Sequence, residues 1–494
     1  MKVKGDYNTA DVKTESGEDE AIDQIQSMVD AEAFEGDEDV AIMPDFHFGS
    51  GAVIGFTMPF KDRVAPATVG VDIGCGMTAI RLNGNPELED WDLREEVDEA
   101  VRERVPVGFD VHNRSDYHMV DDFPWEVCAT KLSEFEKTTG FDLGGDKPPT
   151  FDGTDIPLYG KEYFIDLLKR VEYDSTRAIN SVGTLGGGNH FIEIGEDPDA
   201  VENPYWAVIH SGSRGLGASI AQYWIDRAGK IRNATDVRKH FRLLPKEYRK
   251  YLKFDVDGVS DEDLLDWVQG GMGEDYVAYE LLKDEYKETD PERIGEISTA
   301  LKDALNVIKT GEDPTAYLEE EEAHGYIVDM VFAQTYAQES RKQMAKAVED
   351  AWKELGLTAK DMASRDFIES VHNYIDFRDA TIRKGACRAH EDERVIIPFN
   401  MKYGTLICKG KGDEDWNNSA PHGAGRAMSR TGAKQKFEQD NFENEMADAG
   451  VYLSKHPLDE APGAYKDPET IEDAIGPTVE VKRRVKPLIS IKAE

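Results

Sequence analysis

One glycine-rich segment combines two residue types that bind metal ions. In VGVDIGCGM, Asp72 and Cys75 stand three residues apart beside glycines, so a tight turn can bring a carboxylate and a thiolate to one point. A thiolate can bridge two metal ions, and a carboxylate oxygen suits Mn²⁺ as well as Zn²⁺. Taken alone, the segment is equally compatible with a buried cysteine in a structural turn.

Three histidines stand at the ends of apolar segments. His190 follows GGGN, His210 ends YWAVIH and His372 lies in SVHNYI. A single histidine of this kind is more often a core residue than a metal ligand, yet three of the eleven histidines in the chain share this setting. With Asp72 and Cys75 they supply five donors, enough for a two-metal site that shares one bridging ligand.

The segment GTLGGGNHFIEI has the glycine content of an anion-binding loop. Successive glycines free backbone N–H groups to form a concave nest for a phosphate. The segment is not a P-loop, because no Lys-Ser or Lys-Thr pair follows the glycines. It is not a dinucleotide fingerprint either, because a strand is expected after the glycines in place of a helix. A tight hairpin without a ligand is the alternative.

Another histidine lies among cationic side chains near the C-terminal end. In SAPHGAGRAMSR, His422 precedes a Gly-Ala-Gly turn, and Arg426 and Arg430 follow it. Planar guanidinium groups suit phosphate recognition. An imidazole in this setting suits a nucleophile that takes a phosphoryl-type group from a nucleotide. Residues 378–436 contain twelve Lys or Arg and seven Asp or Glu, against the acidic trend of the chain.

The elements that must position these residues are expected to form one α+β unit. In residues 41–82, 181–217 and 370–494, apolar runs alternate with glycines, which predicts buried strands joined by tight turns. Residues 85–180 and 218–360 are charged and mainly helical in pattern, with one long helix around residues 326–355. We therefore expect a single domain over residues 1–494, with a β-rich core that carries two acidic helical insertions.

The overall charge indicates the salt concentration in which the protein works. The chain has 58 basic and 99 acidic residues, a formal net charge of -41, which favours a salt-adapted, halophilic cytoplasm. This average argues against nucleic acid binding, but a local site can differ from it. The chain shows no signal peptide and no apolar run of roughly 18 residues. Four cysteines without a CxxC pair indicate a reduced compartment, and we expect a cytoplasmic protein with no membrane contact.

Several motifs together resemble one known family. These are MPDFHFG, VGVDIGCGM, GTLGGGNHFIEI, HSGSRGLG, HNY, RKGA, SAPHGAGRAMSR, DEAPGAYKD and the tail VKPLISIKAE. In this order they resemble the RtcB family of GTP-dependent RNA ligases, the 3′-phosphate tRNA-splicing ligases. The matches extend from about residue 40 to residue 492. The combination of HGAGR with DxxC and GGNHF is highly specific for that family.

The resemblance implies a role for each matching residue. His422 matches the histidine that attacks GTP and carries GMP as a phosphoramidate. The matches to the ligands of two Mn²⁺ ions, with Cys75 as the bridge, are Asp72, Cys75, His190, His210 and His372. The matches to the GTP and GMP site are Asn189, His190, Phe191, Ile192, Glu193, His372, Asn373, Pro398, Phe399, Asn400, Met401, Thr405, His422, Gly423, Ala424, Gly425 and Lys492. The candidates for RNA phosphate contacts in the basic stretch are Arg383, Lys384, Arg388, Arg426 and Arg430.

The implied reaction joins two RNA ends. An RNA with a 2′,3′-cyclic phosphate or 3′-phosphate is sealed to one with a 5′-hydroxyl, with GTP and Mn²⁺, in tRNA splicing or RNA repair. An archease-type activator protein is a further implied partner. Two alternatives stay open. A binuclear metallophosphoesterase would use the same five ligands and a metal-bound water, which leaves His422 and Lys492 without a role. A non-catalytic RNA-binding relative would bind RNA without turnover.

The sequence departs from the family pattern at four places. The nucleotide segment reads Pro-Phe-Asn-Met at residues 398–401, where Pro-Gly-Ser-Met is usual. Ser340 precedes Arg341 where the family has Asn-Arg, and Phe48 stands where Pro or Leu is commoner. Pro421 precedes the histidine expected to attack GTP. None of these changes removes a matched metal ligand or the nucleophile.

Overall fold

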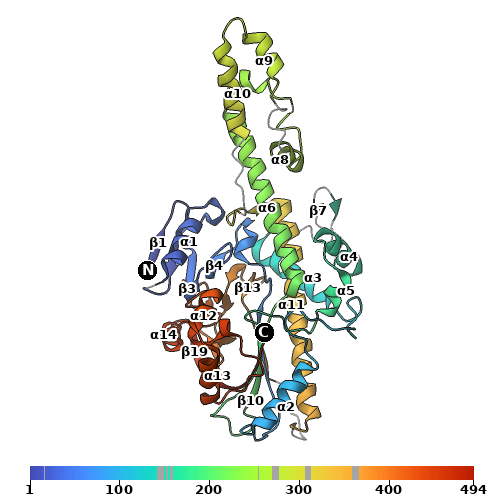
Figure 1. Cartoon of the computed structure of the whole chain (residues 1–494), viewed down its shortest axis with the longest axis vertical. Helices are drawn as coiled ribbons and strands as arrows, with labels where there is room; N and C mark the ends of the chain where they lie inside the picture. Colours follow the sequence, from blue (N-terminus) through green and yellow to red (C-terminus); the bar gives the residue numbers. More distant parts are fainter. Residues whose placement is uncertain are drawn as a thin grey trace.

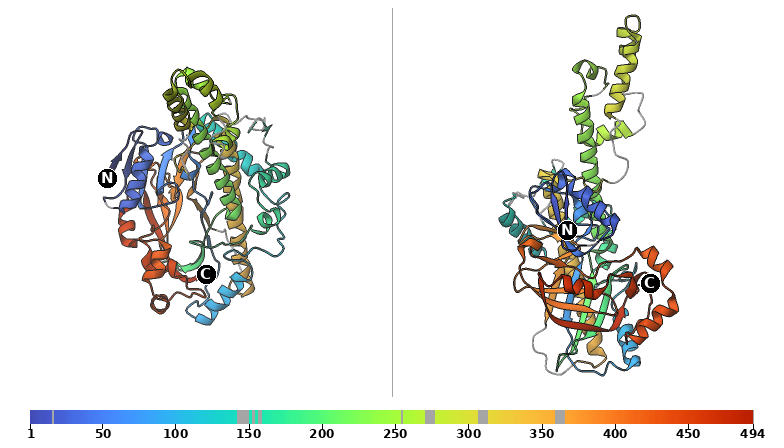
Figure 2. Two further views of the ribbon diagram at one scale, coloured as in Figure 1. Left: turned by 45° about the horizontal axis from the view of Figure 1, so that its top comes forward. Right: turned by 90° about the vertical axis from the view of Figure 1, so that its left-hand side faces the viewer.

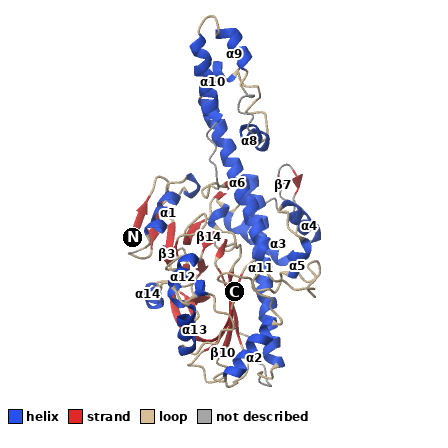
Figure 3. Cartoon of the chain, viewed as in Figure 1, coloured by secondary structure: helices blue, strands red, loops and turns tan. Residues whose placement is uncertain are grey.

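The computed structural model describes residues 1–15, 17–141, 150–151, 154–155, 159–253, 255–269, 277–305, 313–358 and 366–493. Two large β-sheets form the body, and helices lie over and between them (Figure 3). The α+β fold expected from the sequence is confirmed. The boundaries expected between the core and its helical insertions stay a prediction.

A six-stranded mixed sheet forms the N-terminal side of the body. Its strands, in spatial order, are β1 (Lys2–Lys4), β2 (Thr9–Val12), β3 (Val40–His47), β4 (Ile54–Pro59), β14 (Thr381–Lys384) and β13 (Asn373–Ile375). Strand β3 is buried along its whole length. Its pairing with β4 shifts register between Ile42 and His47, around Pro44, which has no N–H to donate. Such a shift re-aims side chains, and Asp45 lies inside it.

The second sheet has seven strands and is antiparallel throughout. In spatial order they are β12 (Phe367–Val371), β6 (Gly76–Arg81), β10 (Tyr205–Ser211), β9 (Phe191–Glu196), β19 (Val479–Ile491), β17 (Thr405–Gly410) and β16 (Arg394–Pro398). The apolar run YWAVIHS makes β10 a fully buried strand between two neighbours. Three two-stranded pairs complete the strands: β5 (Arg63–Val64) with β11 (Leu318–Glu319), β15 (Ala386–Arg388) with β18 (Ser419–Pro421), and β7 (Thr150–Phe151) with β8 (Thr154–Asp155).

Helices cover the sheets and extend away from them. They are α1 (Asp19–Val29), α2 (Trp91–Arg102), α3 (Trp125–Thr139), α4 (Lys161–Arg170), α5 (Ser175–Asn180), α6 (Arg214–Leu243), α7 (Lys246–Arg249), α8 (Asp261–Gln269), α9 (Tyr279–Tyr286), α10 (Pro291–Leu305), α11 (Glu320–Glu354), α12 (Arg430–Lys436), α13 (Gln439–Asp448) and α14 (Pro468–Ala474). Helix α11 contains the predicted long helix and packs against β10 and β6. Within the described residues, no helix is both long and apolar enough to cross a bilayer.

A helical arm projects from the body (Figures 1 and 2). It consists of the outer half of α6 together with α7, α8, α9 and α10. The arm has its own apolar core, in which Val237 and Phe241 of α6 pack with Leu264, Leu282 and Ile297. The C-terminal strand β19 lies in the body, between β9 and β17. The other strands that carry the predicted site residues also belong to the body, so these residues lie at a distance from the outer arm.

Candidate active site

The register of the seven-stranded sheet brings four predicted ligands to one edge. His210 of β10 pairs with Phe191 of β9 on one side and Met77 of β6 on the other. His190 and Cys75 lie just outside those paired strands, so they reach the same edge as His210. Strand β12 pairs with β6 on its other side, and His372 follows the end of β12.

The side chains of this group converge within a few ångströms. The Sγ atom of Cys75 lies 3.3 Å from His210 Nε2 and 3.6 Å from His190 Nε2. His210 Nε2 lies 3.3 Å from His372 Nε2, and His190 Nε2 lies 3.0 Å from Asp72 Oδ2. Cys75, His190 and His210 form a group of buried donors close enough to hold one metal ion. The five predicted ligands thus form one continuous cluster.

The surroundings favour the neutral form of two of the imidazoles, the form that binds a metal ion. Burial, together with the neighbouring imidazoles, lowers the pKa of His210 and His372 well below the usual range. Burial opposes ionisation of Asp72, but the hydrogen bond and charge interaction with His190, together with contributions from Cys75 and Arg214, outweigh it and lower the pKa of Asp72 to about 2. Burial and the adjacent Asp72 charge raise the pKa of the Cys75 thiol well above its usual value. A metal cation would reverse this, because a coordinating thiol is deprotonated.

Backbone contacts fix the orientation of two of these rings. His190 Nδ1 lies 3.0 Å from the Leu185 carbonyl, and His210 Nδ1 lies 3.1 Å from the Asn189 carbonyl. A carbonyl accepts only, so Nδ1 of each ring carries a proton, and Nε2 of His210 turns its lone pair toward the cluster. Beneath the turn, buried Arg341 of α11 donates to the Gly74 carbonyl at 2.9 Å. The donor set and its orientation fit a metal centre.

His422 lies beside this cluster and is held by a carboxylate. It follows strand β18, and its side chain is 16% exposed, so it is more enclosed than a flexible loop would leave it. Its Nδ1 donates to Oδ2 of Asp45 at 2.9 Å. The His422 ring centroid lies 5.0 Å from that of His372 and 6.4 Å from that of His47. Gly425 has φ +72° and lets the backbone approach Asp45, whose carbonyl oxygen would lie 2.0 Å from an added Cβ.

A cavity of about 390 Å³ is lined by His422 and by His210 of the cluster. Its lining includes many of the predicted nucleotide contacts: Asn189, Phe191, Glu193, Pro398, Phe399, Asn400, Met401, His422, Gly423, Ala424, Gly425 and Lys492. Thr405 donates to Glu193 at 3.3 Å, and burial raises the pKa of Glu193 to about 8. The Ile192 side chain points away, into the hydrophobic core. Asn373 lies on the metal side, where it donates to the Asp72 carbonyl at 3.2 Å.

One end of the cavity is lined by cationic side chains, and a buried carboxylate contacts them. Glu460, 1% exposed, accepts from Lys492 at 2.9 Å and from Arg426 at 3.1 Å, and Arg430 lies 3.9 Å away. Tyr465 also donates to Glu460. Arg426 and Arg430 both line this cavity, and guanidinium groups suit the recognition of an anion.

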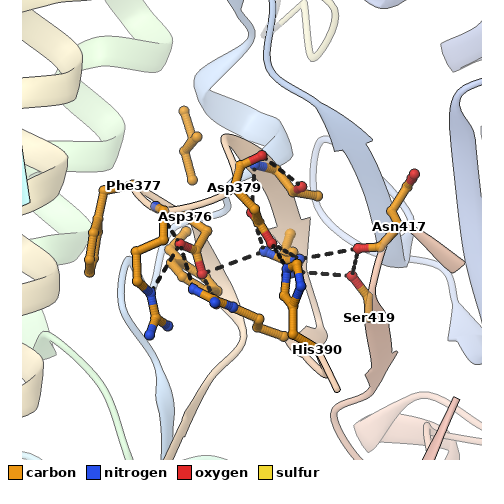
Figure 4. Close-up of polar contacts among 12 residues, drawn as sticks. Asp376, Phe377, Asp379, His390, Asn417 and Ser419 are labelled. Carbon is orange, nitrogen blue, oxygen red and sulfur yellow. Dashed lines mark hydrogen bonds and ion pairs between the residues drawn. The ribbon is translucent and has the colours of Figure 1, made fainter. Parts of the chain in front are cut away.

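The structure corrects the prediction that Arg383 contacts RNA phosphates. Its side chain is fully buried, and its guanidinium is paired with Asp379 at 2.7 Å and with Asp376 at 3.6 Å. Figure 4 shows the two carboxylates among their polar partners, together with His390 and Ser419. A guanidinium locked between two carboxylates is unavailable to a ligand. The basic residues of this stretch are therefore partly structural.

Lys384 and Arg388 do not lie on an open basic surface either. Lys384 is 5% exposed, and its Nζ donates to the Ala67 carbonyl at 2.9 Å. Burial lowers its pKa to about 7. Arg388 is paired with Glu393 at 3.0 Å and with Asp376. A continuous RNA track along residues 378–436 does not form, because paired and buried side chains interrupt it.

Sequence reasoning missed two acidic residues of this site, Asp45 and Glu460. Both lie in motifs that were singled out, MPDFHFG and DEAPGAYKD. A carboxylate directly after an apolar run is the one sequence signal for Asp45. Its contact with His422 joins distant parts of the chain, and no local pattern encodes such a contact.

Comparison with known proteins identifies close similarity along most of the chain. The family described as "tRNA-splicing ligase RtcB" matches residues 27–257 and 293–493. The RNA-splicing ligase RtcB of Escherichia coli K12 is 28% identical over 468 residues, 92% of this chain and 90% of that protein. The RNA-splicing ligase RtcB1 of Escherichia coli ATCC 25922 is 30% identical over 459 residues, with the same coverage. The tRNA-splicing ligase RtcB of Thermococcus kodakarensis is 24% identical over 483 residues, 88% of this chain and 83% of that protein.

Proposed function

The chain belongs to the RtcB family of tRNA-splicing ligases, and on this premise we propose that it joins RNA ends with GTP and Mn²⁺ through a guanylated His422. The observation that carries the proposal is the placement of the His422 ring. It is fixed by Asp45 at 2.9 Å, and it lines a nucleotide-sized cavity beside the metal-type cluster. A hydrolase that activates water needs no histidine in this position.

The contact with Asp45 prepares His422 as a nucleophile. An ionised carboxylate only accepts hydrogen bonds, so Nδ1 carries the proton and Nε2 keeps a free lone pair. Nε2 attacks the α-phosphorus of GTP, the N–P bond forms, and the bond to the β-phosphate oxygen breaks. Pyrophosphate leaves with the electron pair. The ring then carries positive charge, and the Asp45 carboxylate stabilises it.

The cluster residues fit the divalent ions that this chemistry requires. Asp72, Cys75, His190, His210 and His372 would hold them, with neutral imidazoles and a thiolate as donors. When bound, the ions would neutralise phosphate charge as Lewis acids. The protein itself orients the donors through the carbonyl contacts of His190 and His210.

The cavity residues position the nucleotide. Backbone N–H groups of the loop ending at Asn189 suit a phosphate, and the cationic groups of Arg426, Arg430 and Lys492 suit the anionic nucleotide. The guanylate next passes to an RNA 3′-phosphate, which frees the imidazole. The 5′-hydroxyl of the second RNA then attacks that phosphorus, a phosphodiester forms, and GMP leaves.

A ligation assay tests the proposal. An RNA with a 2′,3′-cyclic phosphate and an RNA with a 5′-hydroxyl are incubated with the protein and MnCl₂ in molar KCl, with or without GTP. The proposal predicts a joined product that requires GTP. A metallophosphoesterase would instead remove phosphate from the first RNA without joining the two, whether GTP is present or not.

A further inference from the structure

A groove leads from the candidate metal cluster across the surface to the base of the arm. The nucleotide cavity and a second hollow share Ser50, Ile54, Asn189 and His422. That second hollow, of about 220 Å³, also contains Cys75 among its lining residues. A third hollow adjoins it, and the residues common to the second and third are Ser50, Gly70 and Val71. The third hollow ends at Ile225 of α6 and at Pro314.

The groove is poor in carboxylates, although the chain is strongly acidic. Among the described residues that line the second and third hollows, Asp72 contributes the one carboxylate, and it belongs to the cluster. The buried amine of Lys384 also lines the second hollow. The chain as a whole has 99 acidic residues out of 494. A phosphate backbone can therefore follow the groove without meeting the acidic coat.

Two exposed apolar side chains flank the groove. Phe48 is 48% exposed at the edge of the nucleotide cavity, two residues before Ser50. Val71 is 45% exposed and lines both the second and third hollows. An exposed aromatic ring offers a surface on which a base can stack, as in proteins that bind single-stranded nucleic acid. Phe48 also departs from the proline or leucine that is commoner at this position.

We propose that this groove holds the single-stranded end of an RNA substrate, with a base stacked on Phe48 and the following nucleotides running past Ser50 and Val71 toward Ile225. The proposal rests on the proposed RNA ligase function. It assigns the RNA path to a different surface from the basic stretch at residues 378–436. Gly70, which lines the groove, lies close against the Lys384 side chain, because an added Cβ would be 3.3 Å from it.

The test measures RNA affinity in the full-length protein. Short fluorescent oligoribonucleotides, one ending in a 3′-phosphate and one beginning with a 5′-hydroxyl, are titrated separately without GTP at one KCl concentration. Loss of one stacked base costs about 1–3 kcal/mol, roughly 5- to 150-fold in affinity, so Phe48→Ala should weaken binding by that range. Phe48→Trp should restore it. Val71→Glu should also weaken binding, and its effect should shrink as salt rises.

Matched controls come from exposed apolar residues remote from the groove. Leu243→Ala at the outer end of α6, 77% exposed, and Val201→Glu between β9 and β10, 95% exposed, should leave RNA affinity unchanged. The oligoribonucleotide that responds to Phe48→Ala identifies which of the two ends occupies the groove. Circular dichroism and urea unfolding should match the wild-type protein in the Phe48 and Val71 variants, which shows that they are folded.

The outcomes separate this proposal from the function on which it rests. If the wild-type protein ligates RNA but both oligoribonucleotides bind Phe48→Ala and Val71→Glu as tightly as wild type, the groove assignment is wrong and the ligase function stands. If the wild-type protein neither forms a GMP adduct nor joins RNA ends, the ligase function is wrong and the groove proposal is rejected with it.

Discussion

The His422 ring and the Asp45 carboxylate are 377 residues apart in the sequence and 2.9 Å apart in the structure. Asp45 lies in the register shift of β3, and His422 follows β18, so the contact depends on the packing of two separate strands. It links the candidate nucleophile to the N-terminal sheet. The chemical consequence is a ring with a defined tautomer.

Replacement of Asp45 by Asn should slow guanylylation by about 100-fold or more. The amide can donate to Nδ1, which would place the ring proton on Nε2 and block attack. The rate of GMP-adduct formation measures the effect. As a control, Asp379→Asn removes the carboxylate that contacts His390 at 2.8 Å outside the cavity, and it should reduce stability while leaving adduct formation intact. Equal adduct rates in Asp45→Asn and wild type would exclude a role for Asp45 in orienting the ring.

Replacement of Cys75 by Ser should weaken metal binding at least about 10- to 100-fold, the range seen when residues behind the ligands are lost. A hydroxyl loses its proton far less readily than a thiol and is a poor bridge between ions. Metal analysis after gel filtration in MnCl₂ measures the bound ions. Cys128→Ser changes a buried cysteine outside the cluster and should retain the wild-type metal content. Full occupancy in the Cys75 variant would contradict the ligand assignment.

Replacement of Arg383 by Met should destabilise the fold by about 3–5 kcal/mol, because Asp376 and Asp379 would each lose a buried cationic partner. Urea unfolding measures the free energy. Arg394→Met removes a half-exposed arginine paired with Asp366, and it should cost no more than about 1 kcal/mol. If Arg383→Met lowers the free energy of unfolding only slightly and weakens RNA binding, Arg383 is an RNA contact after all.

Glu193 should make stability depend on pH. Burial raises its pKa from 4.5 to about 8 in the folded protein, so between these values the folded state binds more protons than the unfolded state. Its contribution to the free energy of unfolding should therefore decline from about pH 4.5 to pH 8, by at most about 1.4 kcal/mol per pH unit. Comparison of urea unfolding for wild type and Glu193→Gln across this range isolates the effect. Parallel curves for the two proteins would show that Glu193 does not titrate in this way.

Salt should act oppositely on folding and on RNA binding. The charge of -41 predicts that activity rises with KCl into the molar range, since screening reduces self-repulsion. RNA affinity, measured separately, should fall over the same range as counterions compete. Arg430 is 46% exposed at the cavity, and Arg430→Gln should flatten the log–log salt slope by roughly one unit or less. Maximal activity in dilute buffer would contradict the salt-adapted interpretation.

Local patterns were sufficient to predict much of this molecule. Apolar runs ending in histidine predicted strands such as β10 that deliver His210 to a sheet edge, and the glycine turn predicted the approach of Asp72 to Cys75. The long helix α11 followed from its composition. Net charge along a segment was a poor guide to surface charge, because Arg383 and Lys384 are buried in β14, between the strands β4 and β13. Contacts between distant segments, such as Asp45 with His422, had no local signal.

Labelling with [α-³²P]GTP tests the central claim most directly. Wild-type protein, His422→Ala and the control His390→Ala, which removes an imidazole on a carboxylate outside the cavity, are incubated with labelled GTP and MnCl₂ and separated under denaturing conditions. Circular dichroism checks that each variant is folded. We expect an acid-labile, base-stable adduct on wild type and His390→Ala and none on His422→Ala. A full yield of the same adduct on folded His422→Ala would show that another residue is the nucleophile.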